Sequence, residues 1–137
     1  MMEIIVKNYT VIIKTIIICI IFNILFISCE VEDKEFYKGE YIIVNGCDEA
    51  IDCYAVGKNI SAPSVEIHDY IPANSIFSLR KVNITDKAVI KDIFESIEIY
   101  QNSQKSVKNP IDQDIWLKEL SGNQLTYTLV VDASFFR

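Results

Sequence analysis

Four cysteines and a single histidine have the widest chemical repertoire among the side chains of this 137-residue chain. Thiolates act as nucleophiles, metal ligands and disulfide partners, and imidazole acts as a base or metal ligand near neutral pH. Cys19 and Cys29 lie in or directly after a strongly apolar segment, whereas Cys47 and Cys53 lie in a mixed sequence further on. The two pairs therefore need separate interpretations.

Cys47 and Cys53 flank a turn-like segment, with five residues between them. If that segment joins two strands, the two Cα atoms come within reach of the ~5.5 Å separation that a disulfide requires. The sequence therefore predicts a disulfide between these two cysteines. Two alternatives stay open: a pair of buried free thiols, or two ligands of a metal site completed by His68. Because a metal site needs more ligands than these, we predict no metal and no cofactor.

His68 lies in an alternating segment, with Glu66 and Tyr70 on the same side of it. This position is typical of an exposed strand residue. A catalytic base also needs an oriented partner, and nothing in the sequence nominates one. The chain contains no phosphate-binding glycine loop, no Gly-x-Ser-x-Gly elbow and no His-Glu-x-x-His motif. We therefore predict no catalytic residue.

Residues 1–28 have the arrangement of a secretory signal peptide. Lys7 and Lys14 make the start cationic, residues 16–27 are almost wholly apolar, and the small residue Ser28 follows. The alternative is an uncleaved membrane anchor. Residues 15–28 would span only about 21 Å as a helix at ~1.5 Å per residue, whereas the hydrocarbon core is about 30 Å thick. The length therefore favours a cleaved leader.

The run Leu25-Phe26-Ile27-Ser28-Cys29 resembles the lipobox of bacterial lipoproteins, with an aliphatic residue ahead of a small residue and a cysteine. The resemblance implies cleavage between Ser28 and Cys29, a diacylglycerol on the Cys29 thiol and further acylation, for example with palmitate, of the new amino terminus. The match covers only the first quarter of the chain, and Phe26 stands where leucine is commonest. Two or three acyl chains would hold a soluble domain durably at a cell membrane or outer membrane, outside the cytoplasm.

The rest of the chain is acidic. The chain has 13 Lys and Arg residues and 19 Asp and Glu residues. Residues 1–28 hold two of the basic and one of the acidic residues, so residues 29–137 carry a net charge of −7. Residues 29–39, which are rich in Glu and Asp, are predicted to be the lipidated cysteine and its solvated tether, and residues 40–137 a single globular domain. The charge argues against nucleic acid as a partner, since phosphates require clustered Lys and Arg.

Alternation of period two dominates residues 40–137 and predicts a mainly β fold. We expect a small antiparallel β-sandwich-like domain with one short α-helix, preceded by the helical signal peptide. Residues 41–44 and 51–56 are predicted to form one hairpin, and residues 116–120 and 125–131 another, around Gly122. In the last strand Leu125, Tyr127, Leu129 and Val131 should face the core. Helical spacing predicts a helix over residues 86–95, capped by Thr85 or Asp86.

Two functional hypotheses follow. The first is a cell-envelope lipoprotein anchored by lipid on Cys29, with a non-catalytic role in binding a protein or glycan or in structure. The second is a lipid-anchored enzyme whose site combines carboxylates with His68. A concave pocket holding His68 and two carboxylates would favour the enzyme, whereas a flat exposed aromatic patch, with Trp116 or tyrosines, would favour binding.

Overall fold

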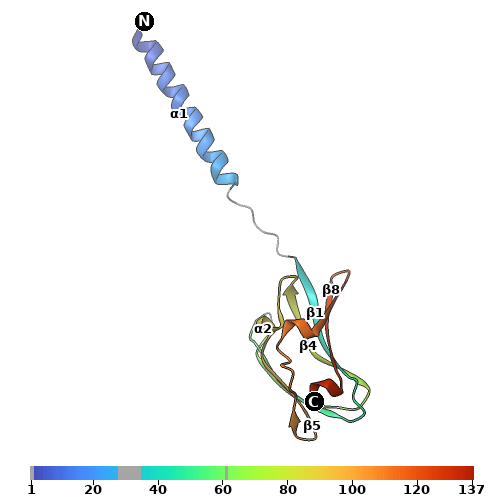
Figure 1. Cartoon of the computed structure of the whole chain (residues 1–137). Helices are drawn as coiled ribbons and strands as arrows, with labels where there is room; N and C mark the ends of the chain where they lie inside the picture. The colour runs from blue at the N-terminus through green and yellow to red at the C-terminus, as the bar shows by residue number, and fades with distance from the viewer. Residues whose placement is uncertain (1, 28–34, 61) are drawn as a thin grey trace. The chain divides into compact units, whose positions relative to one another are not determined.

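A computed structural model describes residues 2–27, 35–60 and 62–137 (Figure 1). The chain divides into two compact units, Met1–Asp33 and Lys34–Arg137. In the first unit the helix α1 covers Met2–Ile27. Ser28 and Cys29, the predicted cleavage and lipidation site, lie outside the described residues. Within the described part of the chain, no helix combines the length and the hydropathy needed to cross a membrane.

The second unit is mainly β, as the alternation predicted. Its strands and short helices, in chain order, are β1 Phe36–Asn45, β2 Ile51–Gly57, β3 Val65–Ile71, β4 Ser75–Thr85, α2 Ile90–Ile93, β5 Phe94–Gln101, β6 Gln104–Lys105, the 3-10 turn Gln113–Ile115, β7 Trp116–Ser121, β8 Gln124–Val131 and the 3-10 turn Ala133–Phe135. Strand β1 begins at Phe36, inside the predicted tether, because Phe36 and Tyr37 already pair with the end of β4. The folded domain therefore begins before residue 40, the start that the sequence predicted.

The strands form two four-stranded sheets. Sheet A has the order β4-β1-β8-β7 and sheet B the order β3-β2-β5-β6. In sheet A, β1 is antiparallel to β4 and parallel to β8, and Figure 1 shows β1 and β8 side by side. Sheet B is antiparallel at each of its pairings. The prediction of a wholly antiparallel domain is therefore wrong for sheet A.

The predicted hairpin of residues 41–44 and 51–56 is not formed. These residues belong to β1 and β2, which lie in different sheets. The side chain of Asn45 has a part in this separation. Its Nδ2 donates to the carbonyl oxygens of Glu49, Ile71 and Pro72, at 2.9 to 3.0 Å, and its Oδ1 accepts from the Cys47 N–H. Asn45 thus holds the connection as an open crossover between the sheets.

The carboxy-terminal hairpin is confirmed. Strands β7 and β8 pair antiparallel, and Gly122 takes a positive φ of 60° in the turn between them, a conformation that glycine adopts without steric cost. In β8, Leu125, Tyr127, Leu129 and Val131 are all buried, as their alternation predicted. Local pattern alone was sufficient here, because the partner strand follows after only two residues.

The predicted helix over residues 86–95 is much shorter in the structure. Helix α2 covers only Ile90–Ile93, since Phe94 already belongs to β5. Neither Thr85 nor Asp86 caps it. Instead the carboxylate of Asp92 accepts a hydrogen bond from the Val89 N–H at 3.0 Å. Of the apolar residues at helical spacing, Ile90, Ile93 and Phe94 are buried, whereas Val89 is 41% exposed. The prediction of a core contact is therefore confirmed for three of the four residues, and the predicted length of the helix is wrong.

The inward side chains of both sheets form one hydrophobic cluster. Its largest fully buried members are Tyr41 and Tyr127, whose stacked rings have centroids 5.0 Å apart and planes at 4°. Phe94 of β5 meets Tyr41 edge-on at 5.3 Å. From sheet B come smaller side chains, Cys53 and Ala55 among them. Together with aliphatic side chains, these rings and small residues fill the space between the two layers.

Arg80 is the one charged residue that is buried among the described residues. Its guanidinium donates to the carbonyl oxygens of Ile93, Lys58 and Pro63, at 2.6 to 3.2 Å, and lies 5.9 Å from the centre of the Phe94 ring. Desolvation lowers the pKa of Arg80. A Cβ at Gly57 would stand 2.5 Å from Arg80 Nη1, so only glycine leaves room for this arrangement.

Candidate functional site

The predicted disulfide between Cys47 and Cys53 is absent from the structure, where both are buried free thiols. The reason is the separation of β1 from β2. Cys47 follows β1, and its Sγ lies 3.7 Å from the Val131 carbonyl oxygen of sheet A, whereas Cys53 points into the core from sheet B. Burial raises the pKa of Cys53 to about 12. Mass spectrometry without reduction distinguishes the two states. Free thiols give the mass calculated from the sequence, whereas a disulfide lowers it by about two mass units.

The outer face of sheet B is rich in polar and aromatic side chains, because β2, β3 and β5 present alternate residues away from the core. Strand register places them in two neighbouring rows. In one row Tyr70, Asp52 and Tyr100 lie side by side, and in the next His68, Tyr54 and Glu98. We refer to these six residues as the tyrosine face.

The rings of the tyrosine face have fixed mutual orientations. Tyr54 stacks on His68 at 4.1 Å with an angle of 13° between the planes, and meets Tyr100 at 5.7 Å and 89°. Tyr54 and Tyr100 thus form two walls at a right angle. They line a shallow depression of about 400 Å³ together with Asp52, Glu98 and Ser103. The depression therefore combines two aromatic rings with two carboxylates.

Glu98 is held by two donors. Lys105 Nζ lies 2.6 Å from its Oε1, and the Tyr100 hydroxyl donates to its Oε2 at 3.0 Å. The Lys105 hydrogen bond is the main reason why the pKa of Glu98 is lowered, and the same bond raises the pKa of Lys105. The Lys105 ammonium also lies 6.0 Å from the centre of the Tyr100 ring. A cation of this chain thus already lies beside a carboxylate and a ring.

Asp52 has fewer polar contacts than Glu98. Within the described residues its only polar side-chain partner is His68, whose Nε2 lies 3.8 Å from Oδ1, and 40% of the Asp52 side chain is exposed. His68 itself is 58% exposed, as its place on an alternating strand predicted. The structure therefore brings His68 to one carboxylate, and leaves most of the bonding capacity of Asp52 open to solvent.

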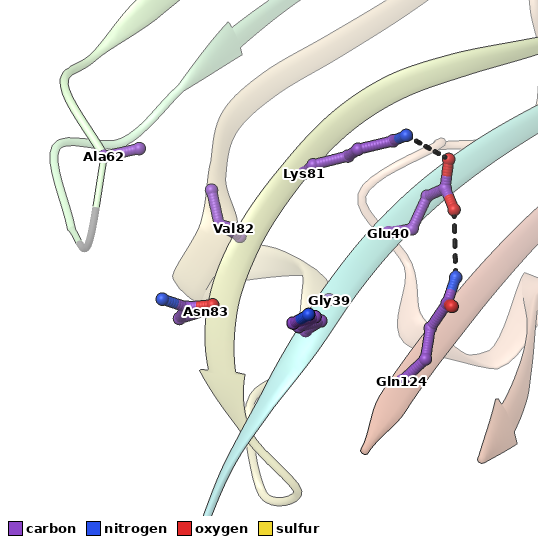
Figure 2. A pocket seen from close by; sticks show the side chains of 8 residues that line it. Gly39, Glu40, Ala62, Lys81, Val82, Asn83 and Gln124 are labelled. Carbon is purple, nitrogen blue, oxygen red and sulfur yellow. Dashed lines mark hydrogen bonds and ion pairs between the residues drawn. The ribbon is translucent and has the colours of Figure 1, made fainter. Parts of the chain in front are cut away.

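The outer face of sheet A carries a different kind of carboxylate. Figure 2 shows Glu40 of β1 between Lys81 of β4 and Gln124 of β8. Glu40 accepts hydrogen bonds from Gln124 at 3.1 Å and from Ser78 at 2.8 Å, and Lys81 Nζ lies 3.5 Å away. Glu40, Lys81 and Gln124 border a second depression, of about 420 Å³. Its acidic group is already satisfied by neighbours of the same sheet.

Trp116 does not contribute to an exposed patch, because it is buried and its indole N–H donates to the Pro110 carbonyl oxygen at 2.8 Å. Among the tyrosines of the second unit, Tyr54 and Tyr70 are exposed, at 42% and 67%. Sequence reasoning missed the tyrosine face, since β5 lies far from β2 in the chain. The available signal was the alternation itself, which places Asp52 and Tyr54, or Glu98 and Tyr100, on the polar side of their strands.

Comparison with protein-family models, with curated proteins and with solved structures gives no match to this chain. In the part of the chain that the structure describes, no three His, Cys, Asp or Glu side chains gather as a metal site. The chemistry of the site therefore has to be inferred from its own geometry.

Proposed function

We propose that the chain is a bacterial cell-envelope lipoprotein. Residues 1–28 are removed as a signal peptide, and diacylglycerol on Cys29 anchors the protein at the cell membrane or outer membrane. The sandwich-like domain that begins near Phe36 then lies outside the cytoplasm and has a non-catalytic binding or structural role. Its partners are membrane lipid, through Cys29, and a ligand at its surface.

The observation that carries the anchor is the sequence from Leu25 to Cys29, directly after an apolar segment too short to span a bilayer comfortably. The described fold supports the proposal in one respect. The hydrophobic cluster is made by residues of the second unit, so that loss of residues 1–28 removes none of its members. Cleavage at Cys29 therefore leaves the core of the domain intact.

Binding has more support than catalysis. The polar surface is a shallow face with exposed rings, and His68 is stacked on Tyr54 with one carboxylate beside it. This face has rings of fixed orientation and a carboxylate that can accept further hydrogen bonds, and both features suit recognition of a ligand. A general base would also need a nucleophile within hydrogen-bond reach of it.

The anchor is tested by metabolic labelling with a clickable palmitate analogue in a bacterial host. Wild type should incorporate the label, and Cys29→Ala should lose it. Cys19→Ala is the matched control, because it removes the other leader cysteine and should label normally. Label that persists in Cys29→Ala, or a mature protein that retains residues 1–28, would contradict the proposal.

A further inference from the structure

We propose that the depression on the tyrosine face is a binding site for a small organic cation with an ammonium head, of the choline type. The inference deepens the proposed binding role and rests on it for the idea that the domain has a ligand. It does not depend on the lipid at Cys29.

The shape and lining of the depression fit such a cation. Tyr54 and Tyr100 stand at a right angle, so that a compact head in the corner touches a ring on each of two sides. Aromatic faces attract ammonium groups through the ring quadrupole, and aromatic corners of this kind recognise methylated ammonium ions. The positions of both rings are fixed, Tyr54 by its stack on His68 and Tyr100 by its bond to Glu98, so little entropy is lost on binding.

The charge of the depression points in the same direction. Two carboxylates, Asp52 and Glu98, lie among its five lining residues, and neither Lys nor Arg is one of them. Lys105 offsets one of these charges from the side, by its ion pair with Glu98. Asp52 remains to attract a cation, whereas an anionic ligand would be repelled and a neutral ligand would gain no charge–charge attraction from it.

Lys105 shows that an ammonium is accommodated here. Its Nζ lies 2.6 Å from Glu98 and 6.0 Å from the centre of the Tyr100 ring, which is the pair of contacts expected for a bound cation. The chain thus supplies a competitor for its own site. Removing that competitor should strengthen the binding of an external cation. Nonspecific binding to the surface would not produce this effect.

The test is a titration of the full chain, purified in an uncharged polyoxyethylene detergent, with choline chloride, followed by calorimetry or amide NMR. We expect a dissociation constant on the order of millimolar, since the site is open to water. The matched ligand is 3,3-dimethyl-1-butanol, which has the shape of choline without its charge. It should bind at least about tenfold more weakly. A short-chain phosphatidylcholine carries the same head on a lipid and tells whether lipid headgroups also bind.

Four variants locate the site. Tyr100→Leu and Asp52→Asn should each weaken choline binding by about two- to fivefold. Lys105→Ala should strengthen it by a similar factor. Tyr70→Leu, on the same face but outside the depression, should leave it unchanged, and unaltered amide spectra away from each substitution verify that the variants are folded.

The proposal is overturned if choline does not bind, if the neutral analogue binds equally well, or if Tyr70→Leu weakens binding as much as Tyr100→Leu does. Any of these results would leave labelling at Cys29 unaffected. A wild-type protein that takes up no palmitate label but still binds choline would instead overturn the anchor and keep the cation site, so the two failures are distinguishable.

Discussion

The two sheets use tyrosine in opposite ways. Sheet A turns Tyr41 and Tyr127 inward, where they stack as the largest fully buried side chains of the core. Sheet B turns Tyr54 and Tyr100 outward, and apart from Phe94 it lines its inner side with small or aliphatic residues. The same side chain thus stabilises the fold in one sheet and is free for a ligand in the other.

The outer carboxylates repeat the contrast. Glu40 of sheet A is satisfied by two hydrogen bonds and a nearby lysine, and only 19% of its side chain is exposed. Asp52 of sheet B has His68 as its polar side-chain partner among the described residues, and is 40% exposed. Groups whose bonds are completed within the chain contribute to stability. Groups whose bonds are left open are those that can recognise something else.

The largest effect that separates the sheets should come from truncating their tyrosines. Tyr127→Ala removes a buried ring from the stack and should lower the free energy of unfolding by about 3–5 kcal/mol. Tyr100→Ala on the outer face should cost less than about 1 kcal/mol. Urea unfolding of both variants measures the difference. Equal losses would mean that the outer tyrosines also support the fold, and the contrast would fail.

The carboxylates should differ by less. Glu40→Ala breaks two hydrogen bonds and an ion pair across three strands, and should cost about 1–2 kcal/mol. Asp52→Ala should cost no more than about 0.5 kcal/mol, because an exposed histidine is its partner. Urea unfolding at neutral pH compares the two. A larger loss at Asp52 than at Glu40 would reverse the assignment of roles.

A smaller effect tests the stacked pair itself. The Tyr127 hydroxyl donates to the Ala88 carbonyl oxygen at 3.0 Å, whereas the buried Tyr41 hydroxyl has no hydrogen-bond partner within the described residues. Tyr127→Phe should therefore cost about 1 kcal/mol, and Tyr41→Phe should be neutral or slightly stabilising. Thermal and urea unfolding would both register the difference, and a clear loss in Tyr41→Phe would indicate a hidden partner.

The smallest effect is a change in titration on the tyrosine face. The pKa of Glu98 is lowered chiefly because Lys105 donates a hydrogen bond to it, so Lys105→Ala should raise the pKa of Glu98 toward its ordinary value. Because the folded-state pKa is the lower one, this interaction stabilises the fold at neutral pH and is lost as pH falls through it. Carbon-detected NMR titration of the carboxyl group measures the shift. An unchanged pKa of Glu98 in the variant would show that Lys105 does not interact with Glu98.

Sequence reasoning succeeded where partners are close in the chain. The alternation from Leu125 to Val131 and the turn at Gly122 identified the last hairpin and its buried face. It failed where partners are distant. Strand β1 pairs in parallel with β8, more than 80 residues later, and nothing in the local pattern of β1 distinguishes that partner from β2. The wrong hairpin, the all-antiparallel sheet and the disulfide all follow from that single error.

The candidate site was beyond prediction for the same reason. Tyr54 and Tyr100 become neighbours only through the pairing of β2 with β5, so their right-angled arrangement has no signature in either segment. Asn45 and Arg80 illustrate another limit. Each is a polar residue in an alternating strand, and only the three-dimensional fold shows that carbonyl oxygens from three residues meet its donors in the core.

That Cys29 anchors this domain at a membrane is tested most directly by the mass of the amino-terminal peptide of the mature protein. We predict a peptide that begins at Cys29 and carries the added mass of diacylglycerol, with or without a third acyl chain. An unmodified peptide that begins at Met1, or one cut at another position with a free Cys29 thiol, would contradict the proposed function.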